Sequence, residues 1–166
     1  MRDPGAVVAA LRQRGATVAV AESLTGGLVT AALTSIPGAS EVVRGGVVVY
    51  ATDLKATLAA VPPDVLDRDG PVAPSTAAAM ARGVRRVCGA TYGVATTGVA
   101  GPDGQGGHPP GTVYVAVASG SAVRIDSARP EGEVGDRDAV RRRAVGMALG
   151  LLFEVLQDDA RHTRES

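Results

Sequence analysis

The sequence has few of the residues from which several common kinds of site are built. It contains one cysteine, Cys88, and two histidines, His108 and His162. A single cysteine excludes an internal disulfide, and these three side chains are too few to supply the ligands of a Cys/His zinc site. A metal held by carboxylates alone is not excluded.

An excess of charge of either sign is also absent, since the 17 basic residues are matched by 17 acidic ones. Proteins that bind nucleic acid through its phosphates normally present a basic surface. We therefore expect no nucleic acid partner, and instead a small molecule or a second copy of the chain.

Long apolar segments are lacking as well. No run of residues approaches the roughly 20 apolar residues that span a bilayer, and the N-terminus shows no signal-peptide pattern. We expect no membrane association and a cytoplasmic location.

Large aromatic side chains are scarce, with one Phe, three Tyr and no Trp among 166 residues. The core must therefore be built from small and β-branched side chains, which favours helices packed tightly on a sheet. Lysine is rarer than most residue types: Lys55 is the only one, and every other basic residue is arginine. An ammonium can lose its proton in a protein and a guanidinium cannot, so Lys55 is the candidate for a removable proton.

The apolar pattern predicts one α/β domain over residues 1–166, with a tail from about residue 158 that frays. Alternating helices and strands followed by a hairpin and a closing helix predict an α/β sandwich with a mixed β-sheet. The strand at 44–51 does not alternate and is expected to be buried on both faces. Helices are predicted over 5–14, 28–33, from 54 to Pro62, 75–88 and 136–156, and strands over 17–21, 44–51, 91–97, 112–118 and 122–128.

Ser23 lies where a predicted strand runs into a glycine-rich helix start, Glu22–Gly27. Backbone N–H groups at such a start bind phosphate or a developing oxyanion, which makes Thr25, Gly26 and Gly27 candidate binding residues. Two interpretations fit: the Ser23 hydroxyl is a nucleophile beside these donors, or the segment is a capped helix whose glycines allow close packing.

Lys55 falls in the first turn of its predicted helix, with Thr52 or Asp53 as the cap. The positive end of the helix dipole disfavours an ammonium there and should lower its pKa. A neutral lysine amine can activate a serine hydroxyl, so Lys55 is a candidate base for Ser23. The alternative is an ordinary surface lysine whose stem lies over the helix.

Tyr50 closes the apolar strand five residues before Lys55. It either passes a proton between Ser23 and Lys55, or holds Lys55 in place, or is a strand-end residue whose hydroxyl is satisfied by the backbone.

The long segment after residue 97 has no predicted structure and is expected to be a binding loop, although its first part is equally compatible with a turn. It matches neither a P-loop nor a dinucleotide fingerprint. Arg137 and Arg141 lie one helical turn apart and either hold a phosphate or belong to a solvated helix face, and Arg137 is the one we select. The candidate binding residues of the loop are Thr97, Gly98, Ala100 and Gly101.

Three segments, in order along nearly the whole chain, resemble the CinA carboxy-terminal domain family, the nicotinamide-nucleotide amidohydrolases. The segments are 21–27 (AESLTGG), 46–50 (GVVVY) with Lys55, and 97–102 (TGVAGP) with 111–114 (GTVY). The resemblance covers roughly residues 6–156 and implies a three-layer α/β/α sandwich.

The resemblance also implies a function, the hydrolysis of nicotinamide mononucleotide to nicotinate mononucleotide and ammonia in pyridine nucleotide recycling. It implies no metal and no cofactor. Ser23 would be the nucleophile and Tyr50 and Lys55 its activating partners. The glycine-rich loops and Arg137 would surround the nucleotide.

Two alternatives remain open from the sequence. His108 could act as the base for Ser23, as in a catalytic triad, although it lies between Gly-Gly and Pro-Pro in a loop. The domain could also be a nucleotide-binding module without turnover. The apolar face of the last helix makes a homodimer the expected assembly.

Overall fold

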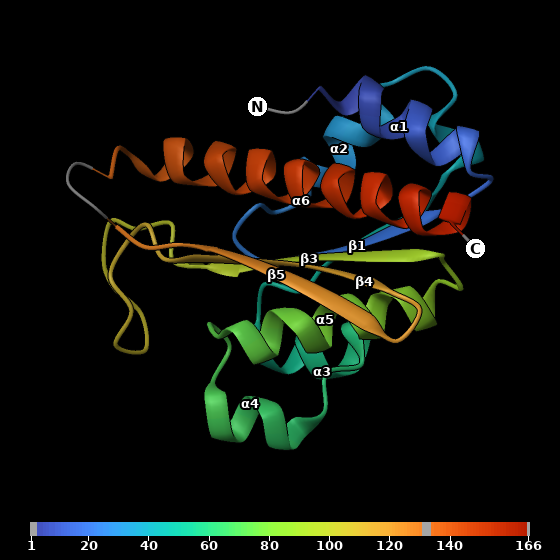
Figure 1. The fold of residues 1–166 in the computed structure, drawn as a ribbon. Helices are drawn as coiled ribbons and strands as arrows, with labels where there is room; N and C mark the ends of the chain where they lie inside the picture. Colours follow the sequence, from blue (N-terminus) through green and yellow to red (C-terminus); the bar gives the residue numbers. More distant parts are fainter. Residues whose placement is uncertain (1–2, 131–133, 166) are drawn as a thin grey trace.

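In the computed structural model, which describes residues 3–130 and 134–165, helices cover both faces of one five-stranded sheet (Figure 1). The order across the sheet is β2-β1-β3-β4-β5. β1 is parallel to β2 and β3, whereas β4 is antiparallel to β3 and β5, so the sheet is mixed as predicted. The strands are β1 (Val18–Glu22), β2 (Val43–Val48), β3 (Tyr92–Gly98), β4 (Val113–Ser119) and β5 (Ala122–Ala128).

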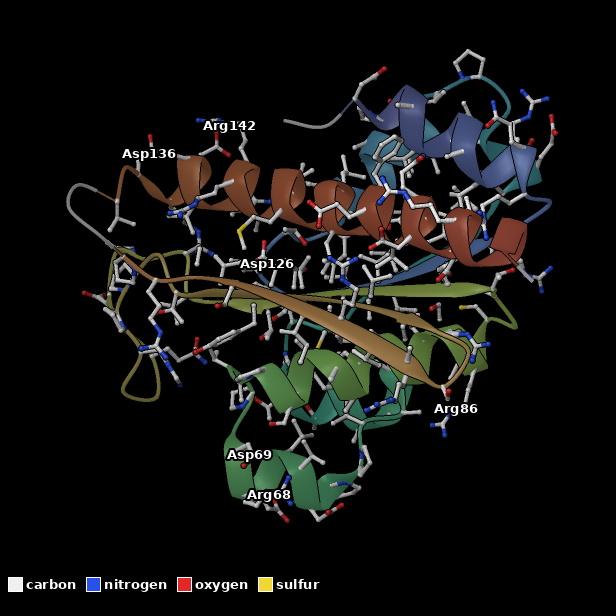
Figure 2. The ribbon with its side chains drawn as sticks, viewed as in Figure 1. Arg68, Asp69, Arg86, Asp126, Asp136 and Arg142 are labelled. Carbon is white, nitrogen blue, oxygen red and sulfur yellow. The ribbon has the colours of Figure 1, made fainter. Side chains whose placement is uncertain are left out.

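The helices form two layers. α1, α2 and α6 lie on one face, α3 and α5 lie on the other, and α4 packs against α5 (Figure 1). The three-layer α/β/α sandwich is thereby confirmed. Figure 2 shows that charged side chains such as Arg68 and Arg142 lie on the outside of these layers. The helices are α1 (Pro4–Gln13), α2 (Leu28–Thr34), α3 (Thr52–Ala59), α4 (Pro63–Asp69), α5 (Pro74–Val87) and α6 (Arg137–Glu165), with a short 3₁₀ helix at Ala39–Glu41.

Successive residues of the central strand β1 face different cores. Val18 and Val20 join the core under α1, α2 and α6, whereas Ala19 and Ala21 join the core above α3 and α5. Side chains alternate across a strand, so a strand covered on both faces is apolar throughout. This explains why the segment reads as a continuous apolar run.

The approach of α5 to its neighbours is very close. A Cβ added at Gly93 of β3 would lie 2.0 Å from the carbonyl oxygen of Ala81 in α5. A Cβ added at Gly83 of α5 would lie 1.6 Å from the carbonyl oxygen of Ala59 in α3. Small residues at these positions therefore allow the backbone of α5 to pack directly against β3 and α3.

The structure differs from the predictions in several elements. β2 is an edge strand whose residues alternate between half-buried and exposed, so burial on both faces was wrong, and the strand ends at Val48 instead of at residue 51. α4 was not predicted, because Pro62 and Pro63 at its start and its charged residues resemble a loop. α6 extends to Glu165 instead of ending near Leu156; Ser166 lies outside the described residues, and fraying of the tail stays a prediction.

The apolar face of α6 packs within the chain. Val140, Ala144, Ala148 and Leu152 are buried in the core beneath this helix. The feature that suggested a homodimer is therefore covered by the sheet, and the homodimer remains a prediction. Of the described helices, none combines the length and apolar character needed to cross a membrane.

We expect alanine to have opposite effects at two helical glycines. Gly83→Ala should lower the free energy of unfolding by about 3 kcal/mol or more, because the methyl group would meet the Ala59 carbonyl oxygen. Gly150→Ala in α6 meets nothing within 4 Å and should raise it by about 0.5–1 kcal/mol. Urea unfolding of both variants checks this, and equal effects would contradict the close packing of α5.

Candidate active site

A pocket of about 320 Å³ lies where the parallel strands β1, β2 and β3 end. This is the edge at which open α/β sheets bind ligands, and the volume suits a small molecule. The residues following all three strands contribute to its walls. The pocket is lined by Ser23, Leu24, Tyr50, Thr52, Lys55, Pro71, Val72, residues 97–101, residues 103–105 and Arg137.

The side chain of Lys55 reaches Ser23 in this pocket. Lys55 Nζ donates a hydrogen bond to Ser23 Oγ at 3.2 Å and another to the carbonyl oxygen of Val49 at 2.8 Å. Ser23 follows β1, and its own N–H is anchored by the carbonyl oxygen of Thr96 at 3.0 Å. The two residues that the sequence analysis paired are therefore within the reach of a nucleophile and its base.

Lys55 is 1% exposed, and burial lowers its pKa from 10.5 to about 8, because removing an ammonium from water disfavours the charged form. The expected direction of the shift is confirmed, but its cause is burial. Lys55 does lie in the first turn of α3, where Ala51, and neither Thr52 nor Asp53, is the N-cap residue.

The start of α2 is occupied by a side chain of the protein itself. Glu22 is fully buried, and its carboxylate accepts hydrogen bonds from the N–H groups of Gly27, Val29 and Thr30 at 2.8–3.1 Å. The hydroxyls of Thr25 and Thr30 add two more at 2.7 Å. The Glu22 carboxylate thereby satisfies N–H groups at the helix start that have no partner within the helix.

The predicted binding role of Thr25, Gly26 and Gly27 does not fit this arrangement, because none of the three lines the pocket. The Gly27 N–H and the Thr25 hydroxyl bind Glu22, and the Gly26 N–H binds the carbonyl oxygen of Ser23. A glutamate ending an otherwise apolar strand was the signal that sequence reasoning missed.

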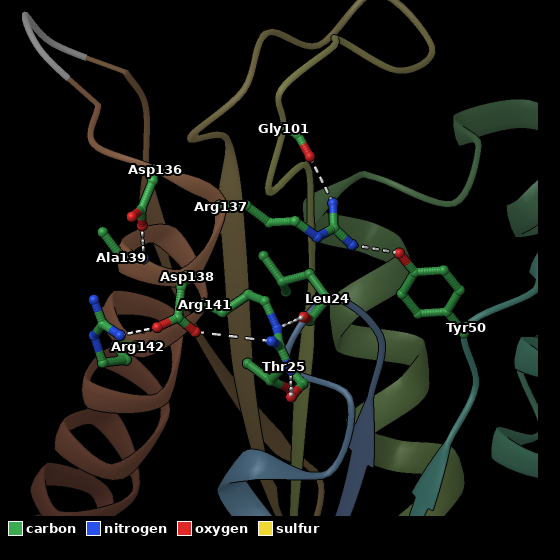
Figure 3. Close-up of polar contacts among 10 residues, drawn as sticks. All are labelled: Leu24, Thr25, Tyr50, Gly101, Asp136, Arg137, Asp138, Ala139, Arg141 and Arg142. Carbon is green, nitrogen blue, oxygen red and sulfur yellow. Dashed lines mark hydrogen bonds and ion pairs between the residues drawn. The ribbon is translucent and has the colours of Figure 1, made fainter.

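Tyr50 lies at the rim of the pocket and is 61% exposed. Its hydroxyl accepts a hydrogen bond from Arg137 Nη2 at 2.8 Å, and Arg137 Nη1 donates to the carbonyl oxygen of Gly101 at 2.6 Å (Figure 3). Within the described residues no hydrogen bond joins Tyr50 to Ser23 or Lys55. The structure brings Tyr50 into the same pocket but directs its hydroxyl to Arg137.

The last two residues of β3 and the loop after it form another wall of the pocket. Thr97, Gly98, Ala100 and Gly101 all line it, as predicted for a binding loop. The hydroxyl of Thr97 donates to the carbonyl oxygen of Pro71 at 2.6 Å, which joins this wall to the segment before α5.

Asp103 and Gln105 also line the pocket and were not predicted. His108 is not among the lining residues; its ring lies edge-on to Tyr114, with centroids 6.5 Å apart. No cluster of three or more metal-binding side chains occurs in the described part of the chain.

Comparison with known proteins identifies the family. The model of the CinA C-terminal domain matches residues 4–156. The chain belongs to the CinA C-terminal domain family. Among CinA relatives, a CinA-like protein of Frankia casuarinae is 49% identical over 152 residues, which cover 92% of this chain and 34% of that protein. A CinA-like protein of Myxococcus xanthus is 49% identical over 152 residues, covering 90% and 35%. The chain thus spans about a third of the length of these curated relatives.

Solved CinA structures share the fold. A competence-damaged protein (CinA) superfamily protein from Klebsiella pneumoniae superposes with a TM-score of 0.88 at 31% identity, covering 93% of this chain and 96% of that one. The competence/damage inducible protein CihA from Agrobacterium tumefaciens gives a TM-score of 0.81 at 34% identity, covering 95% and 99%. The CinA domain therefore accounts for nearly the whole of this chain.

Replacing Lys55 by methionine should stabilise this CinA domain near neutral pH. Below about pH 8 the amine is charged in both states, and burial of this charge destabilises the folded state. The lowering of the pKa from 10.5 to about 8 corresponds to a cost of about 3 kcal/mol. The penalty disappears as pH rises through about 10.5, where the unfolded state also loses the proton.

The measurement is the free energy of unfolding of wild type and Lys55→Met at several pH values. We expect Lys55→Met to be the more stable at about pH 7, by up to about 3 kcal/mol, and the difference to shrink above about pH 10. A difference independent of pH would contradict a depressed pKa.

Proposed function

We propose that this CinA domain hydrolyses the carboxamide of nicotinamide mononucleotide to nicotinate mononucleotide and ammonia, with Ser23 as nucleophile. The observation that supports it most directly is the 3.2 Å contact between Lys55 Nζ and Ser23 Oγ inside the pocket. A lysine with a pKa of about 8 is partly neutral near physiological pH and can accept a proton.

In the proposed mechanism neutral Lys55 removes the proton of Ser23 Oγ as this oxygen attacks the carboxamide carbon. The Lys55 ammonium then gives the proton to the amide nitrogen, ammonia leaves, and an ester of Ser23 remains. Lys55, again neutral, removes a proton from a water molecule that attacks the ester. The same proton returns to Ser23 as nicotinate mononucleotide leaves.

The Leu24 N–H is the proposed donor for the oxyanion. Leu24 lines the pocket, and its N–H makes no hydrogen bond within the described residues. The Ser23 carbonyl oxygen is held by the Gly26 N–H at 3.1 Å. Because the C=O and N–H of a trans peptide point in opposite directions, this bond sets the direction of the Leu24 N–H. As the proposed oxyanion donor, the Leu24 N–H replaces the N–H groups of Thr25 to Gly27 that the sequence suggested.

Arg137 is the proposed contact for the phosphate of the nucleotide. Arg137 lines the pocket. One guanidinium group can donate two parallel hydrogen bonds to two oxygens of a phosphate. Thr97, Gly98 and the rest of the loop wall would enclose the nucleoside. The Tyr50 oxygen accepts a hydrogen bond from Arg137, so its O–H can still donate elsewhere. A role for Tyr50 in proton transfer requires this hydroxyl to approach Ser23 or Lys55.

Ammonia release from nicotinamide mononucleotide is the first experiment. We expect the wild type to release ammonia and both Ser23→Ala and Lys55→Ala to lose about 10³-fold or more in kcat, because the nucleophile and its base act as a unit. His108→Ala is the matched control and should retain activity, since His108 does not line the pocket. A wild type that binds the nucleotide without releasing ammonia would instead be a binding module.

The pH dependence gives a second test. Only neutral Lys55 can accept the Ser23 proton, so kcat/KM should rise with pH and level off above the Lys55 pKa of about 8. The rate of deamidation measured from about pH 6 to 10 checks this. A kcat/KM that falls through this range would show that the ammonium form is the active one and would contradict the mechanism.

A further inference from the structure

Arg141, on the second turn of α6, contacts the turn that carries Ser23. Its Nε donates to the carbonyl oxygen of Leu24 at 3.0 Å, and its Nη2 donates to that of Thr25 at 3.2 Å (Figure 3). Two bonds from one planar guanidinium fix both the position and the orientation of what they hold. The C-terminal helix thereby holds a segment more than a hundred residues earlier in the chain.

These bonds bear on the proposed oxyanion donor. The Leu24 N–H belongs to the peptide group whose carbonyl, that of Ser23, is held by Gly26. The next peptide group begins with the Leu24 carbonyl, which Arg141 holds. Both peptide groups that flank the Cα of Leu24 are thus anchored, so its backbone dihedrals have little freedom.

The rest of the turn is held by the carboxylate of Glu22. The Thr25 hydroxyl and the Gly27 N–H both bind the carboxylate of Glu22, which lies directly before Ser23. We propose that Arg141 is a positioning residue, which completes this anchoring and keeps Ser23 Oγ and the Leu24 N–H aligned for attack on the carbonyl. The kinetic part of this inference rests on the proposed function.

The neighbouring Arg142 provides a matched contrast. Both arginines form an ion pair with Asp138 on the same helix. The side chain of Arg141 is 28% exposed, whereas that of Arg142 is 58% exposed. Figure 2 shows Arg142 on the outer side of α6, away from the sheet. The two arginines share a helix and a charge, but only Arg141 contacts the nucleophile turn.

The test compares Arg141→Met with Arg142→Met. We expect Arg141→Met to lower kcat by about 10–100-fold with KM changed by less than about threefold, because misaligned reacting groups slow the chemical step. The apparent pKa of the pH profile should remain that of Lys55, which Arg141 does not contact. Arg142→Met should retain wild-type kcat. Thermal unfolding verifies that both variants are folded at the assay temperature.

Chemical rescue separates positioning from general stability. Adding guanidinium ion at a concentration that leaves the protein folded should restore part of the kcat of Arg141→Ala and none of that of Lys55→Ala. Arg141→Lys should remain slow, because a single ammonium does not reproduce the paired, planar donors. An Arg141→Met variant with wild-type kcat would overturn the inference.

Covalent labelling of Ser23 by a fluorophosphonate keeps the inference testable if the proposed substrate is wrong. A wild type that releases no ammonia but is labelled would refute the proposed function alone, and slower labelling of Arg141→Met than of Arg142→Met would still support positioning. Equal labelling rates would overturn the inference. Absence of labelling in the wild type would overturn the assignment of Ser23 and this inference together.

Discussion

The buried carboxylate of Glu22, with its three backbone and two hydroxyl donors, joins the end of β1 to the start of α2. An ionised group without an arginine or lysine partner is stable in a core only when its oxygens are fully hydrogen-bonded. Here the unpaired N–H groups of a helix start meet that need. Ser23 follows Glu22 directly, so this carboxylate helps to fix the path of the chain from β1 through Ser23 to α2.

Lys55 differs from Glu22, because its surroundings disfavour its charged form. Its buried amine donates to two neutral acceptors, the Ser23 hydroxyl and the Val49 carbonyl, and to no carboxylate of the described residues. Burial therefore disfavours its charged form. Local destabilisation of this kind is typical of functional sites, where the protonation state matters more than stability.

The long helix α6 connects the layers to the pocket. Its apolar face covers the sheet, while its first two turns reach separate walls through arginine side chains (Figure 3). Arg137 holds the loop after β3 and the hydroxyl of Tyr50, and Arg141 holds the turn after β1. Segments near the two ends of the chain therefore line one pocket.

The local sequence was sufficient to predict the α-helices other than α4, the strands, the mixed α/β architecture and the loop after β3, because these depend on periodicity and on neighbouring residue types. It also selected Ser23 and Lys55 as candidate residues. For Tyr50, the local sequence left a catalytic and a structural role open, and the family resemblance favoured the catalytic one. Only the tertiary structure showed the edge position of β2, the hydrogen bonds from the start of α2 to Glu22, the burial that lowers the Lys55 pKa and the contact of Arg141 with Leu24. Each depends on how far apart distant segments lie once the sheet is assembled, a distance that no local pattern encodes.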